Sequence, residues 1–397
     1  MADTKFNFTE TSNSDLIKFE LINATSSFAN AIRRCILDDV ETIAFKTEPF
    51  NESHVNIIEN TSSLHNEFLL HRIGMIPVNY PDMQNFNPDK YRFVLDVENT
   101  SSKIIDITTQ NFKIIDTVTN TEQPVDDFFP PNPNTSEYIL ITKLKPNPNG
   151  KGEKIKLEAK ASKSSGKINS RWSPVSCVVF NNKRDESKAN AQLLNYLKEK
   201  EANKDSELTS LEINNYTKSF NILDADRYYY TDENNNPNIF EFTIESCGIL
   251  KSYDILNSAL YIINTKVNKF LINLERGIAN NSEEVSITKA DAVMTSFDIT
   301  IRNENHTLGN LLQTYIHKLN QDQAVLEFAG YNQPHPLKDH IVIRIAVKDN
   351  SIDTVKDILQ KTVKHINNIC KTLRDQVAKQ FNITSSTVVL KRASKKP

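Results

Sequence analysis

Residue types that mark many active sites are scarce in this chain of 397 residues. Its four cysteines, Cys35, Cys177, Cys247 and Cys370, stand many tens of residues apart, so they predict neither a zinc ribbon nor a disulfide framework. Its eight glycines form no Gly-rich loop of the kind that holds a phosphate. We therefore expect no metal site and no cofactor.

Long apolar runs are also missing. No stretch approaches the roughly 18 apolar residues of a membrane-spanning helix, and residues 1–10 lack the apolar core of a signal peptide. Hydrophobic residues make up 38% and charged residues 24% of the chain, which is typical of a soluble globular protein. A chain of this length is expected to form two or three domains that have no contact with a membrane.

The net charge of −3 conceals an asymmetry between the two ends of the chain. Residues 288–397 carry 16 Lys and Arg against 10 Asp and Glu, so the remainder of the chain is acidic. A basic end can indicate nucleic-acid binding. Here the charges are spread along a helical pattern and a short tail (Lys391, Arg392, Lys395 and Lys396), which favours a solvated surface.

Two distant segments resemble each other. Residues 19–32 (FELINATSSFANAI) are similar to residues 297–312 (FDITIRNENHTLGNLL), and from Asn23 and Asn303 onward the two align without gaps. In each copy an alternating strand pattern gives way to a polar turn and then to apolar residues at helical spacing. The chain is therefore predicted to contain two copies of one strand-turn-helix unit.

The start of each repeated helix carries recognisable signals. Ser27 and Thr307 are predicted N-caps, because their hydroxyls can accept hydrogen bonds from the unpaired amides of the first turn. Asn30, like Asn310 in the second copy, would then reach back toward the cap. Ala29 and Gly309 keep the first turn slim, which indicates that another group packs closely against it.

Each half of the chain ends in a long amphipathic helix whose apolar residues alternate three and four apart. The first apolar seam consists of Leu256, Leu260, Ile263, Val267, Phe270 and Leu274, and the second of Ile352, Val355, Leu359, Val363, Ile366, Cys370, Leu373 and Val377. Two such seams in one chain predict a pseudo-twofold pair of modules. For either helix alone, packing on its own sheet remains the alternative.

The region between the first repeated helix and the first seam has a different character. It contains strand-like runs (92–97, 103–107, 138–144, 154–159 and 176–180) separated by turns rich in Pro and Asn. We predict an α+β fold with two dimerisation modules, the first interrupted by an inserted β-rich domain. The predicted boundaries are 1–44 plus 220–277 for the first module, 45–219 for the insert, 278–287 for a linker and 288–397 for the second module. The charged segment 183–215 is expected at the surface.

Seven further segments carry a resemblance to a known family. In the second half these are 305–312 (NHTLGNLL), 325–337 (VLEFAGYNQPHPL) and 341–345 (IVIRI), and in the first half 28–34 (FANAIRR), 67–77 (EFLLHRIGMIP), 138–144 (YILITKL) and 171–174 (RWSP). With them the chain resembles the alpha family of RNA polymerase assembly subunits. The first half is similar to the third-largest subunit of eukaryotic RNA polymerase II, archaeal D and the dimerisation domain of bacterial alpha. The second half is similar to the eleventh subunit and archaeal L.

The resemblance implies a non-catalytic platform that brings together the two largest RNA polymerase subunits with small assembly subunits. DNA and RNA would be met only indirectly, through the complex. Fusion of the two halves resembles the arrangement in some large DNA viruses, which implies host cytoplasm and virion for a viral source and the nucleus for a cellular one. Some relatives hold zinc or iron-sulfur in the inserted domain, but the lone Cys177 cannot provide such a site.

The resemblance also implies where partner subunits bind. It places the first repeated helix against a large subunit, and the residues best suited to that contact are Asn30, Arg33 and Arg34, since guanidinium groups make directional contacts at interfaces. The corresponding candidates in the second repeated helix are His306, Leu308, Gly309 and Asn310.

Two other functions have weaker support in the sequence. Glu67, His71 and Arg72 could be drawn as an acid, a base and an anion clamp, but no nucleophile lies nearby, and a packing motif that ends at Gly74 before Pro77 is favoured. A nucleic-acid-binding module would be supported only by the basic C-terminal part, which lacks the aromatic and basic interleaving of stacking platforms.

Overall fold

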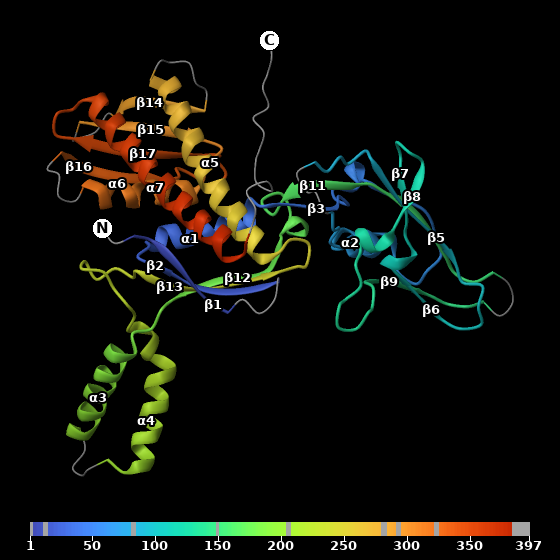
Figure 1. Cartoon of the computed structure of the whole chain (residues 1–397), viewed down its shortest axis with the longest axis horizontal. Coiled ribbons are helices and arrows are strands. Elements are labelled where there is room, and N and C mark those ends of the chain that lie inside the picture. The colour runs from blue at the N-terminus through green and yellow to red at the C-terminus, as the bar shows by residue number, and fades with distance from the viewer. Residues whose placement is uncertain are drawn as a thin grey trace. The chain divides into compact units, whose positions relative to one another are not determined.

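The computed structural model describes residues 3–10, 15–80, 85–147, 151–203, 208–278, 284–290, 295–320 and 325–382. The chain divides into two compact units (Figure 1). One consists of residues 1–35, 177–244 and 256–397, and the other of residues 36–176 and 245–255. The predicted basic tail and half of the predicted linker (279–283) lie outside the described residues.

The first module is built on a four-stranded sheet. Its strands follow the order β1 (Lys5–Glu10), β2 (Leu16–Ile22), β13 (Ile239–Ser246) and β12 (Val175–Asn182), and its helices are α1 (Ser26–Asp38) and α5 (Ser252–Ile278). The central strands β2 and β13 are neighbours although more than two hundred residues separate them in sequence. This pairing confirms that the first module is interrupted by an insertion.

The second module repeats this architecture without an insertion. Its sheet has the order β14 (Val285–Ala290), β15 (Ser296–Arg302), β17 (His340–Val347) and β16 (Leu326–Asn332), all antiparallel, and its helices are α6 (His306–Asn320) and α7 (Ile352–Gln380). Alternate residues of β17 are buried, as expected for a sheet covered on one face. Residues 285–287, which the sequence assigned to the linker, belong to β14 and pair with β15.

The repeat is visible in the backbone itself. Asn23 has φ of 59° and Asn303 has φ of 60°, so both end their strands in the left-handed region that asparagine tolerates better than most residues. The prediction of the N-caps was wrong by two residues. The Thr25 hydroxyl accepts from the amide of Phe28 at 3.2 Å, and the Asn305 side chain accepts from the amide of Thr307 at 2.9 Å. Each helix therefore begins earlier than the periodicity of its apolar residues suggests.

The second compact unit is β-rich. It contains β3 (Glu41–Phe45), β4 (Val55–Asn60), α2 (Asn66–Gly74), β5 (Tyr91–Glu98), β6 (Ile105–Thr108), β7 (Lys113–Asp116), β8 (Thr121–Gln123), β9 (Leu140–Leu144), β10 (Lys154–Ala159) and β11 (Ala161–Ser165). The main sheet has the order β4-β10-β5-β7-β8, and β11-β3 and β6-β9 form two-stranded sheets.

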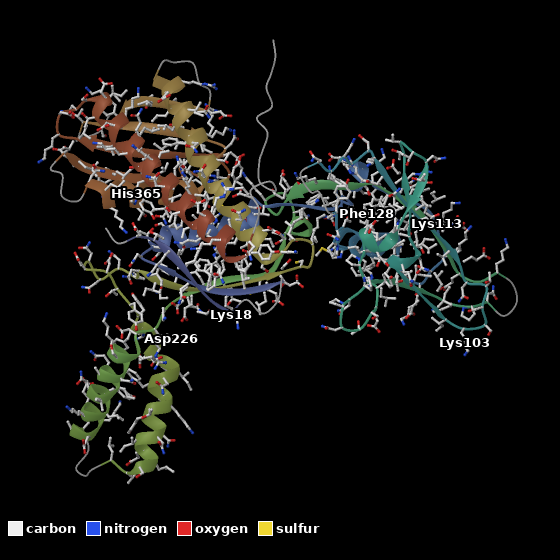
Figure 2. All side chains as sticks on the ribbon, in the orientation of Figure 1. Lys18, Lys103, Lys113, Phe128, Asp226 and His365 are labelled. Carbon is white, nitrogen blue, oxygen red and sulfur yellow. The ribbon has the colours of Figure 1, made fainter. Side chains whose placement is uncertain are left out.

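Aromatic rings fill the centre of this β-rich unit. Phe45, Phe93, Phe112, Phe128 and Phe129 are all buried, and Phe93 meets Phe45, Phe112 and Phe128 edge to face with ring centroids 5.1 to 6.4 Å apart (Phe128 is labelled in Figure 2). Such edge-to-face pairs add to the stabilisation from apolar burial. The strand-like runs predicted for this region are confirmed as β5, β6, β9 and β10.

A helical hairpin follows strand β12. Helix α3 (Glu186–Ala202) is capped by Asp185, and α4 (Ser210–Leu223) begins with a capping box in which Thr209 and Glu212 bond reciprocally. The predicted insert of 45–219 included this hairpin, whereas the compact β-rich unit is 36–176 with 245–255. The difference arises because β12, which leads into the hairpin, belongs to the sheet of the first module.

Candidate functional site: contacts between the two modules

The predicted seam residues are buried in both long helices. On α5, Leu256, Leu260, Ile263, Val267, Phe270 and Leu274 are at most 2% exposed, and on α7 the same holds for Val355, Leu359, Val363, Ile366, Cys370, Leu373 and Val377. Ile352, at the start of α7, is half-buried. That the two apolar seams contact each other stays a prediction. The hydrogen bonds that join α5 to α7 are made by polar residues beside the seams.

One end of the α5–α7 contact is formed by an arginine. The Nε of Arg374 on α7 donates to Oδ1 of Asn257 on α5 at 2.9 Å, and its guanidinium lies 5.1 Å from the ring centroid of Tyr261. At the other end, Nε2 of Gln360 donates to Glu275 at 3.4 Å. Residue numbers rise along α5 as they fall along α7, so the two helices run antiparallel.

Three asparagine side chains lie between these ends. Nδ2 of Asn264 donates to Oδ1 of Asn367 at 2.8 Å, and Nδ2 of Asn367 donates to Oδ1 of Asn268 at 2.7 Å. Nδ2 of Asn268 donates to Oδ1 of Asn264 at 3.1 Å and completes the set. We call Asn264, Asn268 and Asn367 the amide ring, because each of them donates once and accepts once.

The shorter helices α1 and α6 also meet. The hydroxyls of Ser27 and Thr314 are 2.6 Å apart, so Ser27 contacts the other module and does not cap its own helix. The rings of Phe28 and Tyr315 meet edge to face at 6.4 Å. Burial raises the pKa of the Tyr315 hydroxyl, and a hydrogen bond with Thr25 only partly opposes this effect. The phenol is therefore neutral and acts as a packing group.

Strand β1 adds a third contact between the modules. The amide of Phe6 donates to Oε1 of Gln376 on α7 at 2.9 Å, and the rings of Phe8 and Phe381 meet edge to face at 5.1 Å. Among the described residues, the two modules are thus joined by α5 with α7, α1 with α6, and β1 with α7, and Lys266 of α5 also pairs with Glu304 of the second module at 3.9 Å.

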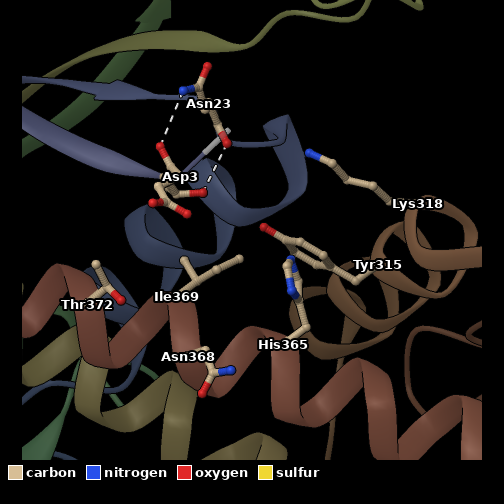
Figure 3. A pocket seen from close by; sticks show the side chains of 9 residues that line it. Asp3, Asn23, Tyr315, Lys318, His365, Asn368, Ile369 and Thr372 are labelled. Carbon is tan, nitrogen blue, oxygen red and sulfur yellow. Dashed lines mark hydrogen bonds between the residues drawn. The ribbon is translucent and has the colours of Figure 1, made fainter. Parts of the chain in front are cut away.

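A cavity of about 230 Å³ lies at this junction (Figure 3). The first module contributes Asp3, Thr4 and Asn23 to its wall, and the second contributes Tyr315, Lys318, His365, Asn368, Ile369 and Thr372. Two hydrogen bonds hold together the residues that the first module contributes. The Thr4 hydroxyl donates to the carbonyl of Asn23 at 3.0 Å, and Nδ2 of Asn23 donates to the carbonyl of Asp3 at 3.2 Å.

The surroundings of His365 in this wall favour its neutral form. Burial lowers the pKa of His365, and the nearby positive charge of Lys318 lowers it further. Its ring lies 5.5 Å from that of Tyr315. The wall therefore combines the Lys318 cation, the acidic side chain of Asp3, one neutral histidine and several uncharged polar groups.

The residues of α1 that were assigned to a subunit interface lie at the half-buried surface of the helix. Nε and Nη2 of Arg33 both donate to Oδ1 of Asn30, at 3.1 and 2.9 Å. Asn30 was predicted to reach back toward the helix cap, and it accepts from Arg33 instead. This pair holds one guanidinium in a fixed orientation. Arg34 is half-buried as well.

The candidates on α6 divide into buried and accessible residues. Leu308 is 2% exposed, and a Cβ on Gly309 would come within 2.5 Å of Cδ2 of Tyr331. The prediction that a group packs closely against this turn is confirmed for Gly309. His306 is exposed with its ring 5.8 Å from that of Tyr331, and Asn310 is half-buried and accepts from the Thr314 hydroxyl. Of the four, only His306 and Asn310 can meet a partner directly.

Sequence reasoning missed a buried arginine in the β-rich unit. Nη1 of Arg171 donates to the carbonyl of Phe45 at 3.0 Å and to the Thr47 hydroxyl, and Nη2 donates to Glu48 at 3.1 Å. A Cβ on Gly74 would come within 2.7 Å of the same Nη1. Helix α2 ends at Gly74, as predicted, and the close approach of Arg171 explains why no larger residue stands there.

Of Glu67, His71 and Arg72, the structure gives Arg72 a packing role. Nε of Arg72 donates to the carbonyl of Ile141 and Nη2 to the carbonyl of Leu140, both at 2.8 Å, so this arginine ties α2 to β9. In the described ranges of the chain, no three residues among His, Cys, Asp and Glu are grouped so that they could hold a metal ion. Nor is any helix within these ranges long and apolar enough to cross a membrane.

Two segments of the chain match the same kind of family. Residues 18–119 and residues 296–376 each match a family described as the RNA polymerase Rpb3/Rpb11 dimerisation domain. The first match covers the start of the first module and part of the β-rich unit. The second lies within the second module.

Several known proteins are similar to this chain. Subunit 3B of DNA-directed RNA polymerases IV and V from Arabidopsis thaliana is 28% identical over 294 residues, which cover 64% of this chain and 86% of the relative. DNA-directed RNA polymerase subunit Rpo3 of Pyrococcus furiosus is 27% identical over 278 residues, covering 66% and 94%. The conjugation stage-specific protein of Tetrahymena thermophila is 25% identical over 306 residues, covering 67% and 94%. About a third of this chain lies outside these alignments.

Proposed function

We infer from the two Rpb3/Rpb11-type dimerisation domains in one polypeptide, which identify the chain as an RNA polymerase subunit of this type, that it serves as a non-catalytic assembly platform. The enzyme it would help to build is a multisubunit DNA-dependent RNA polymerase. The observation that carries the proposal is the presence of both domains in a single chain. The contacts between the two modules support it, because the chain contains within itself both halves of a pair.

The proposed partners are the two largest subunits of the polymerase, together with small assembly subunits. DNA and RNA would meet this chain only through the complex, and the reaction would belong to the large subunits. We propose the same module order as above: a first module, a β-rich insert and a second module, with the α3–α4 hairpin grouped with the first module. A viral source with packaging in the virion stays a prediction.

The surface that we propose for a large subunit is centred on α1. Arg33 is held by Asn30 with its guanidinium oriented, and the next residue, Arg34, is half-buried as well. Charge-assisted hydrogen bonds from such groups are among the strongest directional contacts at an interface. Because the fork of Arg33 is already ordered, less conformational entropy is lost when a partner binds.

The proposal is tested by purifying the tagged chain from its native source. Wild type should bring two large polymerase subunits with it. The double variant Arg33→Ala, Arg34→Ala should lose them, since removing one side of a charged interface pair costs about 2 to 5 kcal/mol, or roughly thirtyfold to several thousandfold in affinity. Circular dichroism of the variant should match wild type, because charge pairs of partly exposed surface arginines contribute little to folding, on the order of 1 kcal/mol or less.

A matched variant controls for loss of charge alone. Arg227 carries a side chain that is 76% exposed and pairs with Asp224 at 3.0 Å, away from α1. Arg227→Ala should retain the large subunits at wild-type levels. If wild type itself brings no large subunit, the assembly role is wrong. If the double variant retains the large subunits as wild type does, the platform stands but the α1 surface does not.

A further inference from the structure

The contact between α5 and α7 depends on polar side chains as well as on apolar burial. Asn257, Tyr261, Asn264 and Asn268 lie four, three and four residues apart in sequence, so they form a stripe along α5 one position beyond the apolar seam. On α7 the matching stripe is Gln360, Asn367 and Arg374. When α5 and α7 pair, the polar stripe of one helix must therefore lie in register with the polar stripe of the other.

The amide ring at the middle of this stripe is asymmetric. Two of its members, Asn264 and Asn268, come from α5 and one, Asn367, comes from α7. Within the ring every carbonyl accepts one hydrogen bond and every amide nitrogen donates one. This closure needs two asparagines one turn apart on one helix and a single asparagine on the other.

Other pairings of the same helices lose this match. Two copies of α7 would bring one asparagine at a ring position, Asn367, from each helix, and two asparagines could not close the ring. Arg374 would then no longer reach Asn257 and Tyr261. Two copies of α5 would bring together four asparagines at the ring positions and no arginine at the position of Arg374. A slide of α7 by one heptad would set Asn367 opposite Asn257 and Tyr261, or opposite Leu271 and Glu275, and in neither position could the ring of three amides close.

We propose that the amide ring, with Arg374 beside it, selects the partner of α5: it pairs α5 with α7 of the same two-module architecture in one register, and disfavours pairing between like modules of two copies. A polar residue at a helix seam specifies register and partner in this way because a mismatch leaves polar groups without hydrogen bonds. The inference concerns the pairing of the modules and is independent of whether the chain enters a polymerase.

A cross-linking experiment on the full chain measures both register and partner. Cysteines are placed at positions 275 and 360 (Glu275→Cys, Gln360→Cys), where the native side chains are 3.4 Å apart. The more accessible natural thiols are removed by Cys177→Ser and Cys247→Ser, and a short bismaleimide is added. Correct pairing joins the two cysteines within one chain, whereas pairing between copies gives a product of twice the mass.

In this background Asn264→Leu, Asn268→Leu and Asn367→Leu are combined. The triple variant should keep its helix content, but the yield of double-mass product should rise by at least about tenfold over wild type, because apolar side chains accept more than one register and partner. Light scattering after size exclusion should show the corresponding dimer. Unchanged intrachain cross-linking in a folded, monomeric triple variant would overturn the proposal.

Two single variants keep the experiment decisive. Asn367→Leu breaks two of the three bonds of the ring, and it is read in place of the triple variant if the latter does not fold. Lys364→Leu changes an exposed residue of α7 outside both the polar stripe and the cavity wall, and it should behave as wild type. If Lys364→Leu gives as much double-mass product as Asn367→Leu, or if neither ring variant folds, the amides have no selective role.

Discussion

Replacing Arg171 with alanine should destabilise the β-rich unit by more than the replacement of an exposed charged residue would. The side chain of Arg171 is 4% exposed, and burial lowers its pKa despite the nearby charge of Glu48. Its guanidinium donates to the Phe45 carbonyl and to the Thr47 hydroxyl inside the unit. Removing this side chain therefore takes away the hydrogen bonds of the Phe45 carbonyl and the Thr47 hydroxyl to Arg171 and leaves a space beside Gly74.

The expected loss of stability follows from the individual interactions that the guanidinium of Arg171 makes. A buried carbonyl left unsatisfied costs about 1 to 3 kcal/mol, and the charged bond to the Thr47 hydroxyl adds about 1.5 kcal/mol net. The Glu48 side chain is 57% exposed, so solvent screening limits its ion pair with Arg171 to less than about 1 kcal/mol. The sum is about 3 kcal/mol, and most of it belongs to the carbonyl and hydroxyl.

The chain provides its own probe for this measurement. Its single tryptophan, Trp172, is 3% exposed and adjacent to the substitution, so its fluorescence in urea reports the unfolding of this unit. Arg171→Ala should lower the free energy of unfolding by about 3 kcal/mol, and Glu48→Gln by less than about 1 kcal/mol. Equal losses in the two variants would refute the reasoning, because the ion pair would then dominate.

Two further predictions concern the paired modules. Leu260→Ala and Leu359→Ala, both at fully buried positions, should each lower the unfolding free energy by about 2 to 5 kcal/mol in chemical denaturation, and losses below about 1 kcal/mol at both would contradict a shared core. Burial opposes ionisation of Glu20, but hydrogen bonds from Lys183 and Asn7 outweigh it and hold its pKa below the ordinary 4.5. The stability that this pair provides should be present above about pH 4.5 and lost as pH falls through the lowered pKa, so urea titrations of wild type and Glu20→Gln should converge in acid.

The repeat and the insertion could be predicted from the sequence because they depend on local patterns. Strand alternation, helical spacing and the polar turns at Asn23 and Asn303 are properties of short segments, and the structure places each in the expected element. The caps were misplaced because Ser27 and Thr307 are as suitable chemically as Thr25 and Asn305. Only the tertiary contact of Ser27 with Thr314 distinguishes the two possibilities.

The buried arginine and the amide ring could not be predicted in this way. Both depend on residues far apart in the chain: Arg171 meets a carbonyl 126 positions away, and Asn264 meets Asn367 103 positions away. A signal for the first existed in the sequence, since a charged residue stands directly before the lone tryptophan in a segment of strands. Asparagines are so frequent on the surfaces of this chain that the three of the ring carried no comparable signal.

The short connection between the modules changes how their association responds to dilution. Helix α5 ends at Ile278 and β14 begins at Val285, so the partner of the first module is tethered a few residues away. For separate subunits the paired fraction falls as concentration falls, whereas a short tether provides an effective concentration on the order of millimolar at any dilution. Pairing in this chain is therefore a first-order process with a fixed ratio of one to one. Neither module can accumulate without the other, even where only a few copies of the protein are made.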